Sequence, residues 1–449
     1  MLLKNFPSLS VIQISLCIFA LRNFTKYTMN NFGLKSRLVA MNFLEFAVWG
    51  AYLTSMGAYL ASNGMGPNIG WFYAVQGIVS IFMPGLMGIV ADRWIPAQRL
   101  LGLCHLVAGG FMLAAGSYAL SAGANVELGQ LFTLYAISVA FYMPTLALSN
   151  SVAFNALTSN GLDTVKAFPP IRVFGTIGFI CTMLAVNFLG FQQTPHQFLL
   201  SGGIGLLFGL YAQTLPACPV GAKVGEKRSI VESLGLDAFH LLKQRKMAVF
   251  FIFSMLLGVS LQITNGYANP FITSFKDIPE FAETFGAQNA NALISLSQIS
   301  ETLCILLIPF CLRKFGIKRV MMIAMLGWVL RFALFGFGDP GAGVWMFILS
   351  MIVYGVAFDF FNISGALYVD QNTTTDIRSS AQGLFMIMTN GLGATLGTLA
   401  AQEVVNHYVY NDAVAGLSMI DGWRTSWFIF AAYALVVLVL FTFIFKEKE

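Results

Sequence analysis

Polar side chains occur within several long apolar stretches of this sequence, and they are the residues whose types and spacing suggest chemistry. A charged side chain at the centre of a membrane span costs about 2.5–3.5 kcal/mol on insertion scales, so we interpret such residues as functional first. Five polar groups meet this criterion, and they lie at Glu45, 172–179, 262–265, 298–301 and 354–359.

The second of these groups follows two consecutive prolines and contains Arg172, Thr176 and Phe179. Spacings of four and seven residues place the three side chains on one face of a helix. An arginine on that face would line a cavity and bind a polar ligand. The alternative is an arginine at a helix end that extends its charge to the membrane surface. We favour the cavity.

Two further groups pair an amide with a second polar residue three positions later, which also places both on one helix face. Gln262 and Asn265 offer donors and acceptors that suit the edge of a nucleobase, and hydrogen bonding between helices is an equal alternative. Gln298 and Glu301 form the other pair. A glutamate in the middle of a span is hard to explain by packing, so we expect Glu301 to be functional.

The group at 354–359 combines aromatic rings with a carboxylate. Tyr354 and Phe358 share a helix face and suit stacking on a planar ligand, whereas rings alone would indicate ordinary packing. Asp359 follows them directly and favours the functional interpretation. We rank Asp359 first for proton coupling, Glu301 second and Glu45 third. Glu45 is expected to pair with Arg172 or another cation, or to titrate.

The elements that position these residues are membrane helices. Of 449 residues, 57% are hydrophobic and 10% are charged, whereas a soluble domain has about 25% charged residues. Apolar runs near 20 residues long recur throughout the chain. The predicted spans are 36–62, 69–91, 99–121, 128–157, 172–190, 197–217, 247–274, 290–312, 318–337, 343–367, 379–401 and 423–446.

The positive charges support this count and give an orientation. With twelve spans and both termini in the cytoplasm, all but three of the 25 Lys and Arg residues lie at cytoplasmic ends, as the positive-inside rule requires. The exceptions are Lys276, Arg331 and Arg424, which fall on or toward the outer side.

A charged central loop divides the chain into two six-helix bundles, a recurring transporter plan. The predicted parts are an N-terminal extension (1–33), an N-terminal bundle (34–217), a cytoplasmic central loop (218–246) and a C-terminal bundle (247–449). We expect the extension to be loosely ordered or interfacial. A true start at Met29 is an alternative, and an extra span is the least favoured. The acidic segment 275–289 is expected to cover the outer mouth.

The loop after the second span contains Asp92, Arg93 and Arg99 in a pattern that resembles the signature of the major facilitator superfamily. Arg313 and Lys314 repeat it loosely after the eighth span. We interpret the five residues as a cytoplasmic gate that latches the two halves. Ordinary positive-inside flanking is the alternative.

Other classes of function fit the sequence poorly. Six cysteines form no CxxC pair and no Cys/His cluster has zinc spacing, so we predict no metal and no cofactor. The net charge of +5 comes without a basic stripe, which argues against nucleic acid. A membrane enzyme is a remote possibility, because no HExxH or paired aspartate-rich motif occurs. We expect no enzymatic activity.

Taken together, these segments resemble the nucleoside:proton symporter family of the major facilitator superfamily, over roughly residues 34–446. Further segments that carry the resemblance are 46–54, 142–146, 168–179, 235–239 and 250–258.

The resemblance implies the major facilitator fold and proton-coupled uptake of purine and pyrimidine nucleosides by alternating access. It implies a monomer in the lipid bilayer of the bacterial cytoplasmic (inner) membrane, with both termini cytoplasmic. Proton-coupled transport of another neutral polar solute, such as a sugar, is the alternative. The substrate site that it implies consists of Arg172, Thr176, Phe179, Gln262, Asn265, Gln298, Glu301, Tyr354, Phe358 and Asp359.

Overall fold

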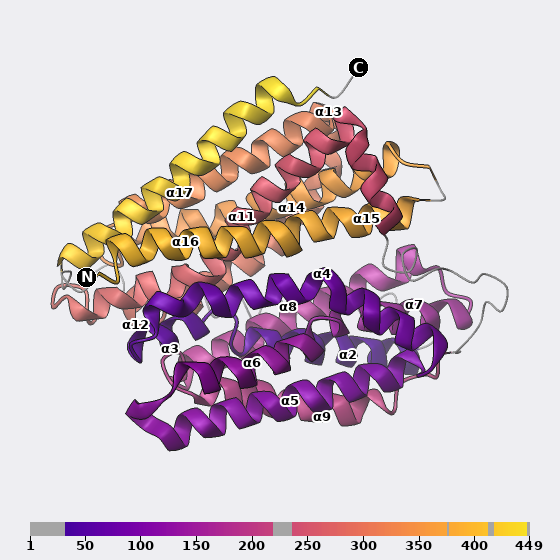
Figure 1. Ribbon diagram of the computed structural model, residues 1–449, viewed down its shortest axis with the longest axis horizontal. Coiled ribbons are helices and arrows are strands. Elements are labelled where there is room, and N and C mark those ends of the chain that lie inside the picture. The colour runs from indigo at the N-terminus through magenta and orange to yellow at the C-terminus, as the bar shows by residue number, and fades with distance from the viewer. Residues whose placement is uncertain (1–31, 219–235, 375–376, 412–416, 447–449) are drawn as a thin grey trace.

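The computed structural model describes residues 32–218, 236–374, 377–411 and 417–446, and the regular secondary structure of these residues is entirely helical. Two bundles lie side by side, one formed by α2–α9 and the other by α11–α17 (Figure 1). Most of the predicted extension, 1–33, lies outside the described residues, as does much of the predicted central loop.

The first bundle alternates long helices with short breaks. Its elements are α2 (Phe32–Gly50), α3 (Met56–Ser62), η1 (Gly66–Asn68), α4 (Ile69–Arg93), α5 (Ala97–Ala122), η2 (Gly123–Asn125), α6 (Leu128–Tyr142), α7 (Thr145–Ser159), α8 (Thr164–Phe188) and α9 (His196–Ala212).

The second bundle has the same general plan. Its elements are η3 (Leu236–Lys243), α11 (Arg245–Ser274), η4 (Phe275–Asp277), α12 (Phe285–Gln288), α13 (Ala290–Phe337), α14 (Val344–Gln371), α15 (Arg378–Met386), the π-helix η5 (Ile387–Gly393), α16 (Ala394–Tyr408) and α17 (Leu417–Ile444).

Nine helices of the described residues are long and apolar enough to cross a membrane. One of them, α13, has 48 residues and contains Gly316 at φ 77°, a conformation that glycine adopts readily. At 1.5 Å per residue a straight helix of this length would be about 72 Å long, more than twice the hydrocarbon thickness. The two predicted spans 290–312 and 318–337 therefore meet at Gly316. With the shorter apolar helix α9 and the α2–α3 pair, the twelve predicted spans are accounted for.

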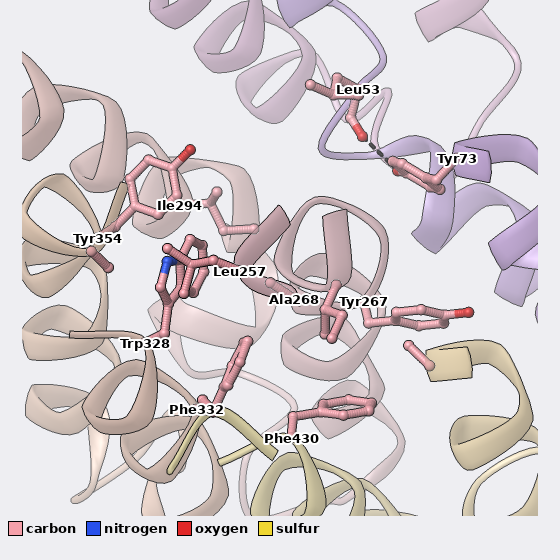
Figure 2. Packing of buried hydrophobic residues seen from close by; sticks show 14 of the residues in the cluster. Leu53, Tyr73, Leu257, Tyr267, Ala268, Ile294, Trp328, Phe332, Tyr354 and Phe430 are labelled. Carbon is pink, nitrogen blue, oxygen red and sulfur yellow. Dashed lines mark hydrogen bonds between the residues drawn. The ribbon is translucent and has the colours of Figure 1, made fainter. Parts of the chain in front are cut away.

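Two of the predicted spans contain irregular backbone. The first span is broken at 51–55, and the carbonyl of Leu53 within this break accepts a hydrogen bond from the Tyr73 hydroxyl (Figure 2). Such side-chain bonds replace those that the helix loses inside a membrane. The eleventh span contains the π-helix η5, a feature that is frequent at functional sites.

Large apolar side chains cover both the outside and the interior. Leu306 and Phe443 are 74% and 77% exposed, as expected for side chains that face lipid rather than water. Inside the second bundle, Trp328, Phe332 and Tyr354 lie close together (Figure 2). The Trp328 and Phe332 ring centroids are 5.6 Å apart, and Trp328 meets Tyr354 edge-on at 6.0 Å. These rings form a rigid frame behind the face of α14 that carries the predicted site.

Candidate functional site

Two residues of α14 form the aromatic part of the predicted site. Tyr354 and Phe358 stack with ring centroids 5.6 Å apart and an interplanar angle of 6°. The helical spacing of four residues brings the rings together, as predicted. Tyr354 is 5% exposed, whereas Phe358 is only partly buried and borders a small cavity with Asn362 and Asn390.

Asp359 follows Phe358 and is also 5% exposed. Its Oδ2 atom is buried and has no hydrogen-bond partner in the described structure. A buried carboxylate oxygen without a donor is costly when it is ionised, so this group is suited to binding a proton.

Glu301 reaches Asp359 because α13 and α14 approach closely at one point. The Ser300 hydroxyl donates to the carbonyl of Ile352, and a Cβ atom added at Gly355 would collide with the Ser300 backbone. Gly355 therefore permits the close approach of the two helices. In the sequence, Gly355 is adjacent to Tyr354 and Ser300 is adjacent to Glu301. Glu301 and Asp359 consequently interact electrostatically.

The amide residues lie on α11 and on the first part of α13. Asn265 Nδ2 donates to Gln262 Oε1 at 2.7 Å, so these two side chains bond to one another along a single helix. Gln298 lies beside the Tyr354 hydroxyl. Each amide retains further donors or acceptors for a ligand.

The first bundle contributes a cation stacked on a ring. The Arg172 guanidinium carbon lies 3.9 Å from the centroid of the Phe46 ring. A Cβ atom at Gly175 would collide with both side chains, so the glycine makes this stacking possible. α8 begins at Thr164, eight residues before Arg172, and not near residue 172 as predicted. Arg172 therefore lies inside the helix and not at its first turn.

Arg172 joins the two bundles electrostatically. Glu301, Glu45 and Asp359 lie near enough for their charges to act on it. α8 packs against α13, which explains how a cation of the first bundle meets carboxylates of the second. The structure therefore brings Arg172, Glu301 and Asp359 into one cluster at the interface, which we call the charged cluster.

Phe179 and Thr176 lie on α8 beyond Arg172, with Phe179 buried and Thr176 partly buried. Phe179 meets Trp49 edge-on at 6.4 Å, and Trp49 lies 6.0 Å from Tyr142. The buried Nε1 atom of Trp49 has no hydrogen-bond partner. Trp49 and Tyr142 were not predicted as site residues, although both lie in segments that carry the family resemblance.

The direct partners of the Glu45 carboxylate are His105 and Thr145, and its charge also acts on Arg172. Glu45 is fully buried, and its carboxylate lies 3.1 Å from His105 Nε2 and accepts a 2.6 Å hydrogen bond from Thr145. The Tyr142 hydroxyl donates to its backbone carbonyl. Glu45 therefore belongs to a network within the first bundle. His105, on α5, was not recognised because nothing in the sequence links it to Glu45.

One end of the interface, next to α3 and α12 in Figure 1, is closed by buried amides. Gln192 Oε1 accepts from Asn269 Nδ2 and from the Asn291 backbone, both at 3.1 Å. Its Nε2 donates to the carbonyl of Gln288 at 3.3 Å. Gln192 follows α8, whereas its three partners belong to the second bundle, so each bond crosses between the bundles.

Asn187 and Thr54 add further bonds at the same end. Asn187 Nδ2 donates to Asn289 Oδ1 at 2.8 Å and its Oδ1 accepts from the Ala292 backbone at 3.3 Å. Thr54 donates to Asn291 Oδ1 at 3.1 Å. We call the bonds that Gln192, Asn187 and Thr54 make to the second bundle the amide seal. Part of it comes from 275–289, the segment that was expected to cover the outer mouth.

The predicted gate residues lie outside the interior. Asp92 and Arg93 are exposed at the end of α4, and Arg99 is exposed in the first turn of α5. Arg313 and Lys314 are exposed just before Gly316, where the Lys314 amine lies 5.7 Å from the Phe310 ring centroid. Their role as a latch remains a prediction.

Arg331, which the charge pattern assigned toward the outer side, is 2% exposed within the second bundle. Its guanidinium carbon lies 4.6 Å from the centroid of the Tyr354 ring. Its position toward the outer side stays a prediction, and a charge count gave no sign that this arginine is packed against an aromatic ring.

Among the described residues, no group of three or more His, Cys, Asp or Glu side chains is arranged to hold a metal ion. The candidate site contains one cation, two carboxylates, amides and stacked rings.

Known proteins resemble this chain along most of its length. A family model described as nucleoside H+ symporter matches residues 32–449. The xanthosine permease of Escherichia coli (strain K12) is 45% identical over 416 residues, which cover 92% of this chain and 96% of that protein. Nucleoside permease NupG of the same organism is 45% identical over 420 residues, covering 93% and 97% of the two chains.

Solved structures show the same fold. A crystal structure of nucleoside transporter NupG superposes with a TM-score of 0.83 at 43% identity, covering 92% of this chain and all of that chain. A D-xylose-proton symporter, 13% identical, gives a TM-score of 0.67 over 93% and 98% of the two chains, which shows the fold alone. The predicted major facilitator fold of two six-helix bundles is confirmed.

Proposed function

We propose, from the premise that this chain belongs to the nucleoside H+ symporter family, that it carries nucleosides into the cell together with protons. The observation that supports this most strongly is the charged cluster. It places one cation of the first bundle opposite two carboxylates of the second, beside rings and amides that suit a nucleoside. A site between two bundles is typical of carriers that work by alternating access.

The nucleoside would occupy the space beside α11, α13 and α14. Gln262, Asn265 and Gln298 present donors and acceptors to the edge of the base. Glu301 accepts hydrogen bonds from the ribose hydroxyls, and an aromatic ring of α14 stacks on the base. Thr176 and Phe179 complete the site from the first bundle.

The charges of the cluster explain how a proton is coupled. With Arg172 charged and both carboxylates ionised, the cluster has a net charge of −1. One proton on Asp359 makes it neutral, and a neutral cluster is less costly to move through a low-dielectric interior. Asp359 is the best carrier of that proton because its Oδ2 atom is buried without a hydrogen-bond donor.

The amide seal would close the outer mouth while the other end admits or releases the substrate. Replacing Gln192 with leucine removes three bonds between the bundles, although Asn269 Nδ2 keeps its bond to Asn291 Oδ1. Each such loss costs about 1–3 kcal/mol, so we expect the outward-open population to rise at least about fivefold. The measurement is the rate at which an impermeant maleimide, added outside, modifies a cysteine introduced at Asn265.

Gln213→Leu is the matched control, because Gln213 donates within α9, to the carbonyl of Gly209. We expect its labelling rate to equal that of the parent protein. Equal labelling of the Gln192 variant and this control would show that the seal does not hold the outer mouth closed.

The proposed location is the bacterial cytoplasmic membrane, with both termini in the cytoplasm, since this orientation fits the positive-inside rule. A monomer is sufficient, because all the residues of the site come from one chain. The substrate class is tested by competition in proteoliposomes. Uridine and adenosine should both suppress uptake of labelled nucleoside, whereas xylose should not. Suppression by xylose and not by nucleosides would favour the sugar alternative.

A further inference from the structure

Arg331 is a buried cation that the proposed mechanism does not use. It lies in the second part of α13, is 2% exposed and takes part in none of the ion pairs observed among the described residues. Burying an arginine without a carboxylate partner costs folding free energy. This cost suggests that Arg331 has a function.

The guanidinium makes polar contacts to two helical segments. Arg331 Nη1 donates to the carbonyl of Ser350 on α14 at 2.7 Å and to the hydroxyl of Ser297, on the first part of α13, at 3.3 Å. The Ser350 hydroxyl donates back to the Arg331 carbonyl at 3.0 Å. Ser297 precedes Gln298, and Ser350 lies one helical turn before Tyr354. Arg331 thus connects the two segments that carry half of the ten predicted substrate residues.

The same guanidinium contacts the Tyr354 ring. Its carbon atom lies 4.6 Å from the ring centroid, while Phe358 stacks on Tyr354 and Trp328 meets it edge-on. Three neighbours therefore surround Tyr354, which leaves it 5% exposed. Phe358 is more exposed and borders the cavity that Tyr354 does not line. The ring available to a ligand is therefore that of Phe358.

We infer that Arg331 is a positioning residue that fixes the Tyr354–Phe358 stack, so that Phe358 is the ring on which the nucleoside base stacks. This rests on the proposed function, because it concerns the same substrate site. Arg331 acts through Tyr354 and does not contact the substrate. Its loss should weaken nucleoside binding and leave proton coupling intact, because Asp359 is not among its contacts.

The test compares gradient-driven uptake of labelled uridine in proteoliposomes for the parent protein, Arg331→Gln, Arg331→Lys and Tyr354→Leu. We expect Arg331→Gln to raise KM about tenfold, which corresponds to a loss of roughly 1.4 kcal/mol in binding free energy. The steady-state accumulation ratio at saturating uridine should be unchanged. Arg331→Lys keeps the charge and should give an intermediate KM. Arg331→Lys also provides the test if the Arg331→Gln variant fails to fold.

A double variant, Arg331→Gln with Tyr354→Leu, tests the route of the effect. Because both changes disturb the same stack, we expect its KM to be no higher than that of the worse single variant. Arg424→Gln is the matched control, since Arg424 is partly exposed on α17 beside Asp421, and its KM should be unchanged.

The outcomes separate the two proposals. A parent-like KM for Arg331→Gln, or fully additive effects in the double variant, would overturn the positioning role alone. A parent protein that takes up no nucleoside would overturn the proposed function and this inference with it.

Discussion

Replacing Asp359 with asparagine is expected to abolish accumulation of nucleoside against its concentration gradient. Asparagine keeps the size of the side chain but cannot bind or release a proton at this position. The variant should still exchange labelled for unlabelled nucleoside across the membrane, within about tenfold of the parent rate, because its neutral amide resembles the protonated acid. The measurements are uptake under an imposed pH gradient and counterflow without one.

Glu45→Gln is the matched control, since it makes the same change at another buried carboxylate of the interior. An amide at position 45 can still accept from Thr145 and donate to an acceptor nitrogen of His105. We expect it to accumulate nucleoside as the parent does. Glu301→Gln, the second candidate, should mainly raise KM. Gradient-driven accumulation by Asp359→Asn, with none by Glu45→Gln, would move the proton site to the first bundle.

Replacing Arg172 with glutamine is expected to reduce transport about 100-fold or more. The variant leaves Glu301 and Asp359 without the cation that faces them across the interface. Removing one partner of a buried charged set costs about 3–5 kcal/mol, because the remaining charges are uncompensated. It also removes the guanidinium from the Phe46 ring, which should loosen this wall of the site. The measurement is the initial rate of uptake, normalised to the protein reconstituted.

Two variants give this prediction its controls. Arg172→Lys keeps a charge that can lie over Phe46 and should recover part of the rate, although it lacks the planar guanidinium. Lys166→Gln removes a cation from the same helix at a position paired with Asp163 in solvent, and should transport at the parent rate. A parent-like rate for Arg172→Gln would show that the charged cluster does not hold the two bundles in a transport-competent arrangement.

Local spacing predicted which candidate residues lie together, because the residues concerned lie on the same helix. The Tyr354–Phe358 stack follows from a separation of four residues and the Gln262–Asn265 bond from a separation of three. The cost of burying a charge also selected Arg172, which the structure places at the interface between the bundles. These inferences need only helical geometry and the energetics of a membrane interior.

Contacts between distant segments could not be predicted in the same way. His105 meets Glu45 across 60 residues, and Gln192 meets Asn269 across 77. Neither pair has a local pattern, since each depends on how helices pack. The contacts of Arg331 could not be predicted for a related reason, because its partners lie on other segments of the folded chain.

The sequence also did not reveal where helices begin or change geometry within the predicted spans. Hydropathy placed the start of the fifth span near residue 172, because Lys166 and the adjacent prolines are unfavourable in an apolar core. α8 nevertheless begins at Thr164, and it contains Pro169 and Pro170. The π-helix within the eleventh span has no hydropathy signature either. Hydropathy reports where lipid can surround a helix, and it does not report where the helix itself begins or widens.

The central claim, that nucleoside and proton enter together, is tested most directly by trapping a pH-sensitive dye inside proteoliposomes that contain the parent protein. Uridine is added outside with no imposed gradient, and the membrane potential is clamped with potassium and valinomycin. We predict that the interior acidifies as labelled uridine enters, and that Asp359→Asn admits uridine without acidification. Uridine entry by the parent protein with no change in internal pH would contradict proton-coupled transport.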